Sequence, residues 1–182
     1  MFPALLENPI NVFFEGQDIG ENIVVLVRAH PITNLRWLIP AVLIFLIPFF
    51  IEPFARFLGY NLFTQLPDIY LTAFIIINYL LVLVITFEGF LNWYFNVNIV
   101  TNEKIIDVDF SSILLKNIDY APLEDVQEVT PSVGGVLGMI FNFGNIAVQT
   151  AGAQVDVDFK DIPNPDRVAD IILDQKDKTE DR

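Results

Sequence analysis

The sequence predicts an α+β membrane protein, made of a two-helix transmembrane hairpin and an antiparallel β domain with a C-terminal helix. Three observations predict this class: two long apolar runs lie close together, strand-like alternation begins after Trp93, and a helical period returns near the C-terminus. The chain divides into an N-terminal segment (1–34), a helical hairpin (35–90), a β domain (91–175) and a polar tail (176–182).

The composition excludes several classes of function. Of the 182 residues, 53% are hydrophobic and only 18% are charged, an apolar excess too large for an ordinary soluble domain. Acidic residues outnumber basic ones 23 to 10, giving a net charge of −13. This balance argues against binding nucleic acid, or anionic lipid headgroups, through a broad basic face. The absence of cysteine excludes disulfide frameworks and thiolate zinc sites.

The N-terminal segment contains one β-rich stretch, Ile23–Val27, just before the first apolar run. This stretch either adds a strand to the sheet of the later β domain or lies at the membrane interface. The sequence favours neither alternative. The first alternative requires both ends of the helical hairpin to emerge on the same side.

Two apolar runs predict the membrane spans, which we place at about 35–58 and 68–90. The run Ile69–Phe87 has no charge and no proline, and as a helix it would rise about 28 Å, close to the thickness of the hydrocarbon core. The run Leu38–Ile51 is also uncharged but contains two prolines, which membrane helices tolerate. Buried helices of a soluble protein are the alternative, but the rest of the chain is too small and too polar to cover them.

The short connection Gly59–Asp68 predicts an antiparallel hairpin with both chain ends on one side of the bilayer. More basic residues flank the ends of the hairpin than its loop, where Arg56 stands alone; those at the ends are Arg28, Arg36, Lys104 and Lys116. The positive-inside rule therefore predicts cytoplasmic termini and a cytoplasmic β domain.

Asn78 is the one strongly polar side chain near the middle of the second run. A polar side chain at such a depth often makes an interhelical hydrogen bond, which contributes roughly 0.6–2 kcal/mol. Asn78 is therefore a candidate assembly residue, linking either the two spans of one chain or two copies of the protein.

Alternating apolar and polar residues predict strands in the second half, for example in Tyr94–Val100, Ile105–Phe110 and Gln154–Lys160. Between such strands, 101–103 and 150–152 are expected to form hairpin turns. Three residues are singled out for turns because Asn and Gly tolerate positive φ; they are Asn102, Gly144 and Gly152.

The period changes again at the C-terminus, where Asn164 can cap a helix whose first residue is Pro165. The helix would bury one apolar stripe, formed by Val168, Ile171 and Ile172. The residues beyond Gln175 have nothing to bury, so we expect this tail to be disordered.

We find no catalytic constellation and predict a protein that is not an enzyme and holds no cofactor or metal. The single histidine, His30, precedes the first span and is expected at the headgroup level, and no nucleophile-elbow pattern surrounds any serine. Two carboxylate pairs, Asp107/Asp109 and Asp156/Asp158, each share one strand face. A solvated acidic face is the favoured interpretation, and a metal-dependent hydrolase using these pairs is the less favoured alternative.

Four stretches of the second half occur together in a familiar order and spacing. They are VTNEKIIDVDF (Val100–Phe110), PLEDVQEV (Pro122–Val129), GVLGMIFNFGNIAVQTAG (Gly135–Gly152) and IPNPDRVADII (Ile162–Ile172). With the entry segment Glu21–Ile32, they resemble the bacterial pleckstrin-homology-like (PH-like) domain, in the variety fused to two transmembrane helices. The resemblance covers residues 20–175.

The resemblance implies a PH-like antiparallel β-sandwich or partly open barrel, with about six strands after Trp93 and the C-terminal helix capping one end. Eukaryotic PH domains bind inositol phosphates through basic residues around their first hairpin. Here that hairpin is flanked by Asp107 and Asp109, and residues 91–182 hold sixteen acidic and seven basic residues. Binding of anionic lipid headgroups is therefore not expected.

The expected function is that of a membrane-anchored interaction or scaffold module in a bacterial plasma membrane, which docks protein partners or forms homo-oligomers. A module that senses lipid or the state of the membrane is the alternative. A glycine-rich loop, a possible docking loop, supplies apolar side chains that either touch the bilayer or pack inside, and we expect them to pack inside; they are Val136, Leu137, Met139, Ile140 and Phe141.

Overall fold

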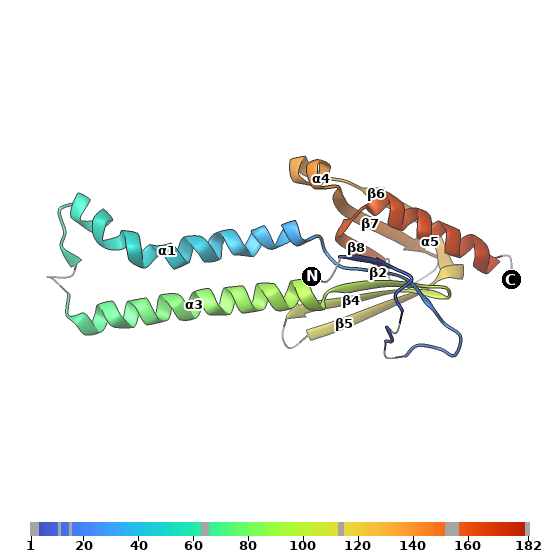
Figure 1. Cartoon of the computed structure of the whole chain (residues 1–182), viewed down its shortest axis with the longest axis horizontal. Coiled ribbons are helices and arrows are strands. Elements are labelled where there is room, and N and C mark those ends of the chain that lie inside the picture. The colour runs from blue at the N-terminus through green and yellow to red at the C-terminus, as the bar shows by residue number, and fades with distance from the viewer. Residues whose placement is uncertain are drawn as a thin grey trace. The chain divides into compact units, whose positions relative to one another are not determined.

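The computed structural model describes residues 4–10, 12–14, 16–62, 66–112, 115–151 and 157–180 (Figure 1). The chain forms two compact units. One unit, called here the helix pair, comprises residues 34–91. The other, called here the β domain, combines residues 1–33 with residues 92–182. Both ends of the hairpin therefore connect to the same domain.

The helix pair consists of α1 (Leu35–Phe57), which follows a 3-10 turn η1 (Pro31–Asn34), and α3 (Asp68–Phe95). Both helices are long and apolar enough to cross a membrane, judged by length and composition. Most of their large apolar side chains point outward, and only 6% of the most apolar stretch of α3 is buried. Three prolines lie inside α1 without ending it; they are Pro40, Pro48 and Pro53.

Close packing holds α1 and α3 side by side (Figure 1). Gly89 of α3 lies against the indole ring of Trp37, where a Cβ atom would clash with the ring. Further along the pair, the rings of Phe45 and Tyr79 are 5.4 Å apart. The described residues buried in these helices are small or polar, and they are Ala41, Glu52, Ala55 and Asn78.

The larger sheet of the β domain, sheet A, has the strand order β1-β2-β3-β4-β5 and is antiparallel throughout. Its strands are β1 (Leu5–Glu7), β2 (Ile23–Val27), β3 (Val97–Thr101), β4 (Lys104–Ser112) and β5 (Leu115–Pro122). The stretch Ile23–Val27 is thus a strand paired with β3, with Val27 opposite Asn98.

The smaller sheet, sheet B, has the antiparallel order β6-β7-β8. Its strands are β6 (Val126–Ser132), β7 (Phe143–Thr150) and β8 (Val157–Pro163). A short 3-10 turn η2 (Leu123–Asp125) precedes β6, the helix α4 (Gly135–Phe141) connects β6 to β7, and α5 (Pro165–Glu180) ends the chain. In the described part of the chain, six strands follow Trp93, as expected.

The main core lies among the two sheets and α5. Fully buried residues come from β2, β7 and β8, including Val25, Ile146 and Phe159, and from the inner face of α5. The predicted apolar stripe of α5 contributes Val168 and Ile172, both at 0% exposure. The domain is therefore α+β, with two antiparallel sheets and a packed C-terminal helix.

A second apolar cluster covers the outer face of sheet A. Its buried members are Ile23, Leu26, Ile99 and Ile106. The N-terminal residues Val12 and Phe14 pack on this cluster. The N-terminal segment therefore contributes two strands and a partial cover for the outer face of sheet A.

The prediction of a disordered tail was wrong for residues 176–180, which continue α5 to Glu180. The hydroxyl of Thr179 donates a hydrogen bond to the carbonyl of Gln175, and Lys178 lies in the last turn, where a cation interacts favourably with the helix dipole. Residues 181 and 182 lie outside the described residues.

Candidate functional site

At one end of the β domain, the segment that leads into the helix pair contacts the segment that follows the helix pair. The indole N–H of Trp93 donates a hydrogen bond to the carbonyl of Ala29 at 2.9 Å. The backbone N–H of His30 donates to the carbonyl of Asp161 on β8 at 2.7 Å. The guanidinium carbon of Arg28 lies 4.9 Å from the centre of the Tyr94 ring. These contacts hold the segment that leads into the helix pair and the segment that follows it at the same end of the β domain.

The helix α4 lies at this same end of the β domain. The imidazole ring of His30 stacks on Phe143, with the centroids 5.5 Å apart, and lies 6.3 Å from Phe141. At the C-terminus of α4, Asn142 adopts a left-handed conformation, and its side-chain amide donates to the side-chain oxygen of Asn164 at 2.6 Å. The helix is thus attached both to the exit segment and to the start of α5.

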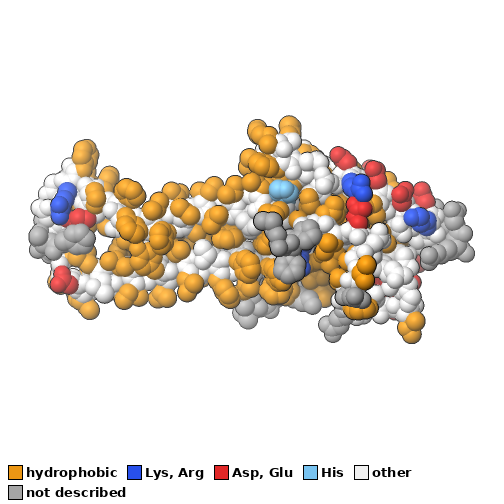
Figure 2. All heavy atoms as spheres, viewed as in Figure 1, with side chains coloured by type: hydrophobic (Ala, Val, Ile, Leu, Met, Phe, Trp, Pro, Cys, Tyr) orange, Lys and Arg blue, Asp and Glu red, His pale blue; other side chains and the backbone are white. Residues whose placement is uncertain are grey.

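The apolar side chains of α4 point outward, so the prediction that they pack inside was wrong. Figure 2 shows hydrophobic side chains gathered over α4. Their exposed fractions are 73% for Val136, 50% for Leu137, 73% for Met139, 67% for Ile140 and 43% for Phe141. We call these five side chains the α4 surface.

Gly138 explains why the side chains of α4 face outward. It is the buried residue of the helix, and a Cβ atom at this position would lie 3.0 Å from the carbonyl oxygen of Phe143. The helix therefore approaches β7 through a glycine, with no room on that side for a larger side chain. The helix has only seven residues, so its other positions project away from the domain.

The α4 surface lies in an uncharged part of an acidic protein. Between Glu128 and Asp156 the sequence has no charged residue, although the chain carries a net charge of −13. The stretch that forms the α4 surface therefore contributes no charged side chain of its own toward an apolar or anionic partner.

His30 serves a packing role at this site. Burial lowers the pKa of His30, which favours the neutral imidazole at pH 7. The Nδ1 atom of the ring accepts a hydrogen bond from the backbone N–H of Ile32 at 3.2 Å, and the hydroxyl of Thr33 donates to the His30 carbonyl. The side chain packs against Phe143 and Phe141, and its position at the headgroup level stays a prediction.

The first predicted carboxylate pair is less solvated than expected. Asp107 and Asp109 lie on the same face of β4 as the buried Ile105, and Asp119 of β5 lies directly opposite Asp107. Burial, followed by the nearby charges of Asp109 and Asp119, raises the pKa of Asp107 to about 6. In the second pair, Asp158 is exposed and Asp156 lies outside the described residues.

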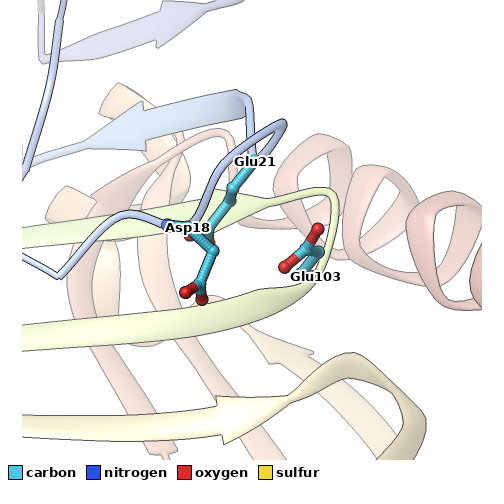
Figure 3. A group of neighbouring side chains, drawn as sticks. All are labelled: Asp18, Glu21 and Glu103. Carbon is cyan, nitrogen blue, oxygen red and sulfur yellow. Dashed lines mark hydrogen bonds between the residues drawn. The ribbon is translucent and has the colours of Figure 1, made fainter.

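The carboxylates that could share a metal ion are different ones. In the part of the chain that the structure describes, one group of three carboxylates has oxygen atoms within 4.8 Å of one another, formed by Asp18, Glu21 and Glu103 (Figure 3). Asp18 and Glu21 lie in the loop before β2, and Glu103 in the β3–β4 turn. The two Asp pairs that suggested a hydrolase do not form such a group among the described residues.

Lys104 supplies a cation at this acidic group. Its ammonium lies 3.0 Å from Asp18 Oδ2 and 3.1 Å from Glu21 Oε2. Burial opposes the charge of Lys104, but its hydrogen bonds to Asp18 and Glu21 raise its pKa. The arrangement therefore joins the N-terminal loop to the β3–β4 turn through a partly buried ion pair, in which Glu21 is buried and Asp18 is exposed. Sequence spacing could not reveal it, because the partners are distant along the chain.

The predicted turn residues have three different outcomes. Asn102 lies in the β3–β4 turn without a positive φ; its side-chain oxygen accepts from the backbone N–H of Asn22 at 2.7 Å, and its own N–H donates to the Asn22 carbonyl. Gly144 is not in a turn: it lies in β7, where a Cβ atom would clash with the carbonyl of Ser132. Gly152 lies outside the described residues.

Asn78 is buried within the helix pair, with 7% of its surface exposed, and its side-chain oxygen has no hydrogen-bond partner. This burial favours a role between the two helices of one chain. The role of Asn78 in assembly between copies stays a prediction.

Comparison with known proteins identifies one family. The family model described as "Bacterial PH domain" matches residues 33–176, which is more than half of the chain. Searches of curated proteins and of solved structures returned no match. The matched region begins just before α1, so it includes both long helices as well as the strands that follow.

Proposed function

We propose that this chain, which belongs to the bacterial PH domain family, is a membrane-anchored interaction module that docks protein partners or assembles with copies of itself at the bilayer surface. A PH-like domain suggests an interaction module for proteins or lipids, and such domains are generally not enzymes. The observation that carries the proposal is the contrast between a helix pair with apolar side chains outside and a β domain with its own apolar core.

The anchor is supported by the length and the surface of the helices. The 28 residues of α3 extend about 42 Å, enough to cross a hydrocarbon core of about 30 Å with some tilt. In water, the outward Phe, Leu and Ile side chains would form an apolar patch far larger than soluble proteins expose. In a bilayer the same side chains contact lipid, and backbone groups are satisfied within each helix.

The proposed location is a bacterial plasma membrane, with both termini and the β domain in the cytoplasm. The β domain contains both residue 33 and residue 92, so the exit and the return of the chain lie on one side. Basic residues are more frequent at this end of the hairpin than at its loop, where Arg56 pairs with Glu52 at 2.7 Å. Trp37, Trp93 and Tyr94 supply the aromatic residues typical of the interface.

Two regions of the β domain are suited to docking a protein. The strand β5 is the last strand of sheet A, so one of its backbone edges can accept an added strand from a partner. Tyr120 is an exposed side chain on this strand. The second region is the outer side of α5, where Leu173 is an exposed apolar residue.

A photo-crosslinking experiment tests the docking. A photoreactive amino acid replaces Tyr120 or Leu173 in the full-length chain, and Glu124, an exposed residue of η2, serves as the control position. After irradiation of intact membranes, we expect protein adducts from Tyr120 or Leu173 and none from Glu124. The absence of protein adducts from both positions would contradict docking at these regions.

A second candidate function is sensing of the bilayer itself, and the exposed α4 surface is the observation that favours it. The same experiment separates the two functions when a photoreactive residue also replaces Met139. Lipid adducts at Met139, without protein adducts at Tyr120 or Leu173, would favour sensing over protein docking.

A further inference from the structure

We propose that α4 inserts the α4 surface into the interface of the bilayer that the helix pair crosses, and so acts as a second anchor for the β domain. This inference rests on the proposed membrane anchoring and goes beyond it, because it assigns a lipid-binding role to a particular surface of the β domain. It also differs from headgroup recognition by a basic pocket, which the charge of this protein does not favour.

The first argument is the chemistry of the surface. Five apolar side chains project from a helix of seven residues, and none of the seven carries a charge or a hydrogen-bonding side chain. Close approach of the buried Gly138 to β7 keeps these side chains outside the domain. A surface of this kind suits the boundary between headgroups and acyl chains, where apolar side chains leave water.

The second argument is the place of α4 in the β domain. Phe141 contacts the ring of His30, and Leu35, the first residue of α1, follows His30 by only five positions. Even a fully extended segment of this length spans only about 18 Å. The helix α4 therefore lies at the end of the β domain from which the chain enters the bilayer.

The third argument is charge, and it favours lipid over an acidic or basic protein as the partner. The cytoplasmic leaflet is negatively charged, so acidic surfaces are repelled from it. The outer side of α5 carries Asp166, Asp170, Asp174 and Asp177, whereas the segment between Glu128 and Asp156 carries no charge. Of these two helices, only α4 lacks charged side chains of its own that an anionic membrane would repel.

Insertion of α4 gives the β domain a fixed face toward the membrane. With α4 inserted, the end that contains His30 and Trp93 faces the bilayer, and the outer side of α5 stays in water. The second anchor would thereby determine which surfaces are presented to protein partners.

A fluorescence experiment tests this proposal, and the absence of native cysteine allows single labelling sites in the full-length chain. Met139→Cys places an environment-sensitive fluorophore on α4. Thr130→Cys, an exposed position on β6, is the control in water, and Ile77→Cys, an exposed position on α3, is the control in lipid. Each labelled protein is reconstituted into vesicles of phosphatidylcholine and phosphatidylglycerol, with or without brominated lipid.

We expect brominated lipid to quench the labels at Met139→Cys and Ile77→Cys, with the α4 label about 5–10 Å below the headgroup level, and to spare Thr130→Cys. Adding Val136→Asp and Ile140→Asp should return the α4 label to water and leave the α3 label quenched. A water-accessible α4 label beside a quenched α3 label overturns insertion of α4 but leaves the anchoring intact. An α4 label shielded from aqueous iodide but not quenched by brominated lipid indicates a protein contact, and also overturns it. If the α3 label is not quenched either, the membrane anchoring itself is wrong.

Discussion

The helix pair and the β domain distribute apolar and polar residues in opposite ways. In the β domain, Val25, Ile146 and Phe159 are fully buried, and the acidic residues of α5 face outward. In the helix pair, Phe and Leu side chains face outward, whereas Asn78 and Glu52 are among the few buried residues. One chain thus carries two opposite arrangements of apolar residues. The side on which apolar residues lie, and not their number, distinguishes the two regions, and the proposed bilayer around the helix pair accounts for the difference.

The largest expected effect comes from matched phenylalanine truncations in the two regions. Phe159→Ala removes a fully buried ring from the core of the β domain and should lower the free energy of unfolding by about 3–5 kcal/mol. Phe87→Ala removes a ring of α3 that is 55% exposed and should change the stability of the β domain by less than about 0.5 kcal/mol. Urea unfolding in detergent, followed by near-ultraviolet circular dichroism, compares the two. Equal losses of the free energy of unfolding in the two variants would contradict the distinction between the helix pair and the β domain.

A smaller effect is expected from a pair of glycines in the β domain. Gly144→Ala places a methyl group against the backbone of Ser132 and should cost about 1–3 kcal/mol, because β6 and β7 must separate locally. Gly134→Ala, with open space around it and no positive φ, is the matched control and should leave stability unchanged. The same unfolding assay measures both. If Gly144→Ala leaves the free energy of unfolding unchanged, the close approach of β7 to β6 does not contribute to stability.

The sequence predicted the elements whose signals are local. An uninterrupted apolar run such as Ile69–Phe87 indicates a long helix directly, and the alternation in Ile105–Phe110 indicates a strand, because each pattern is repeated within one element. The C-terminal helix begins at Pro165, as the preference of proline for the first helical position predicts, whereas the side-chain oxygen of Asn164 accepts a hydrogen bond from Asn142.

The remaining features depend on contacts between distant residues. The outward direction of Met139 follows from the approach of Gly138 to β7, which no local pattern encodes. The ion pair of Lys104 with Glu21 and the hydrogen bonds between Asn102 and Asn22 arise because the N-terminal loop returns to the β3–β4 turn. The alternating pattern correctly placed Asp107 and Val108 on opposite faces of β4. Only the arrangement of the sheets determines how deeply Asp107 is buried.

The smallest effect on stability is expected for Asp107, a residue of the β domain whose carboxylate is only partly solvated. Its pKa in the folded chain, about 6, exceeds the ordinary value of 3.8, so ionisation of Asp107 destabilises the fold. The free energy of unfolding should therefore fall as pH rises from about 4 to 6, with no further loss from this group at higher pH. One pKa unit corresponds to about 1.4 kcal/mol, and partial solvation reduces this effect.

Asp107→Asn should therefore stabilise the protein by about 1–2 kcal/mol at pH 8, and the gain should disappear below pH 4. Asp170→Asn, on the exposed side of α5, is the control and should show no comparable pH-dependent gain. Thermal unfolding across this pH range tests the prediction. A gain that is equal at pH 4 and pH 8 would assign the effect to packing and not to charge.

The anchoring of the chain in a bilayer is tested most directly by fractionation of cells that express the full-length protein. Membranes are prepared without detergent, washed with alkaline carbonate and sedimented by ultracentrifugation. We predict that the full-length chain stays in the washed membrane pellet and is released only by detergent. Recovery of the chain in the supernatant as a folded monomer would show that the apolar faces of α1 and α3 do not require lipid, and would contradict the account.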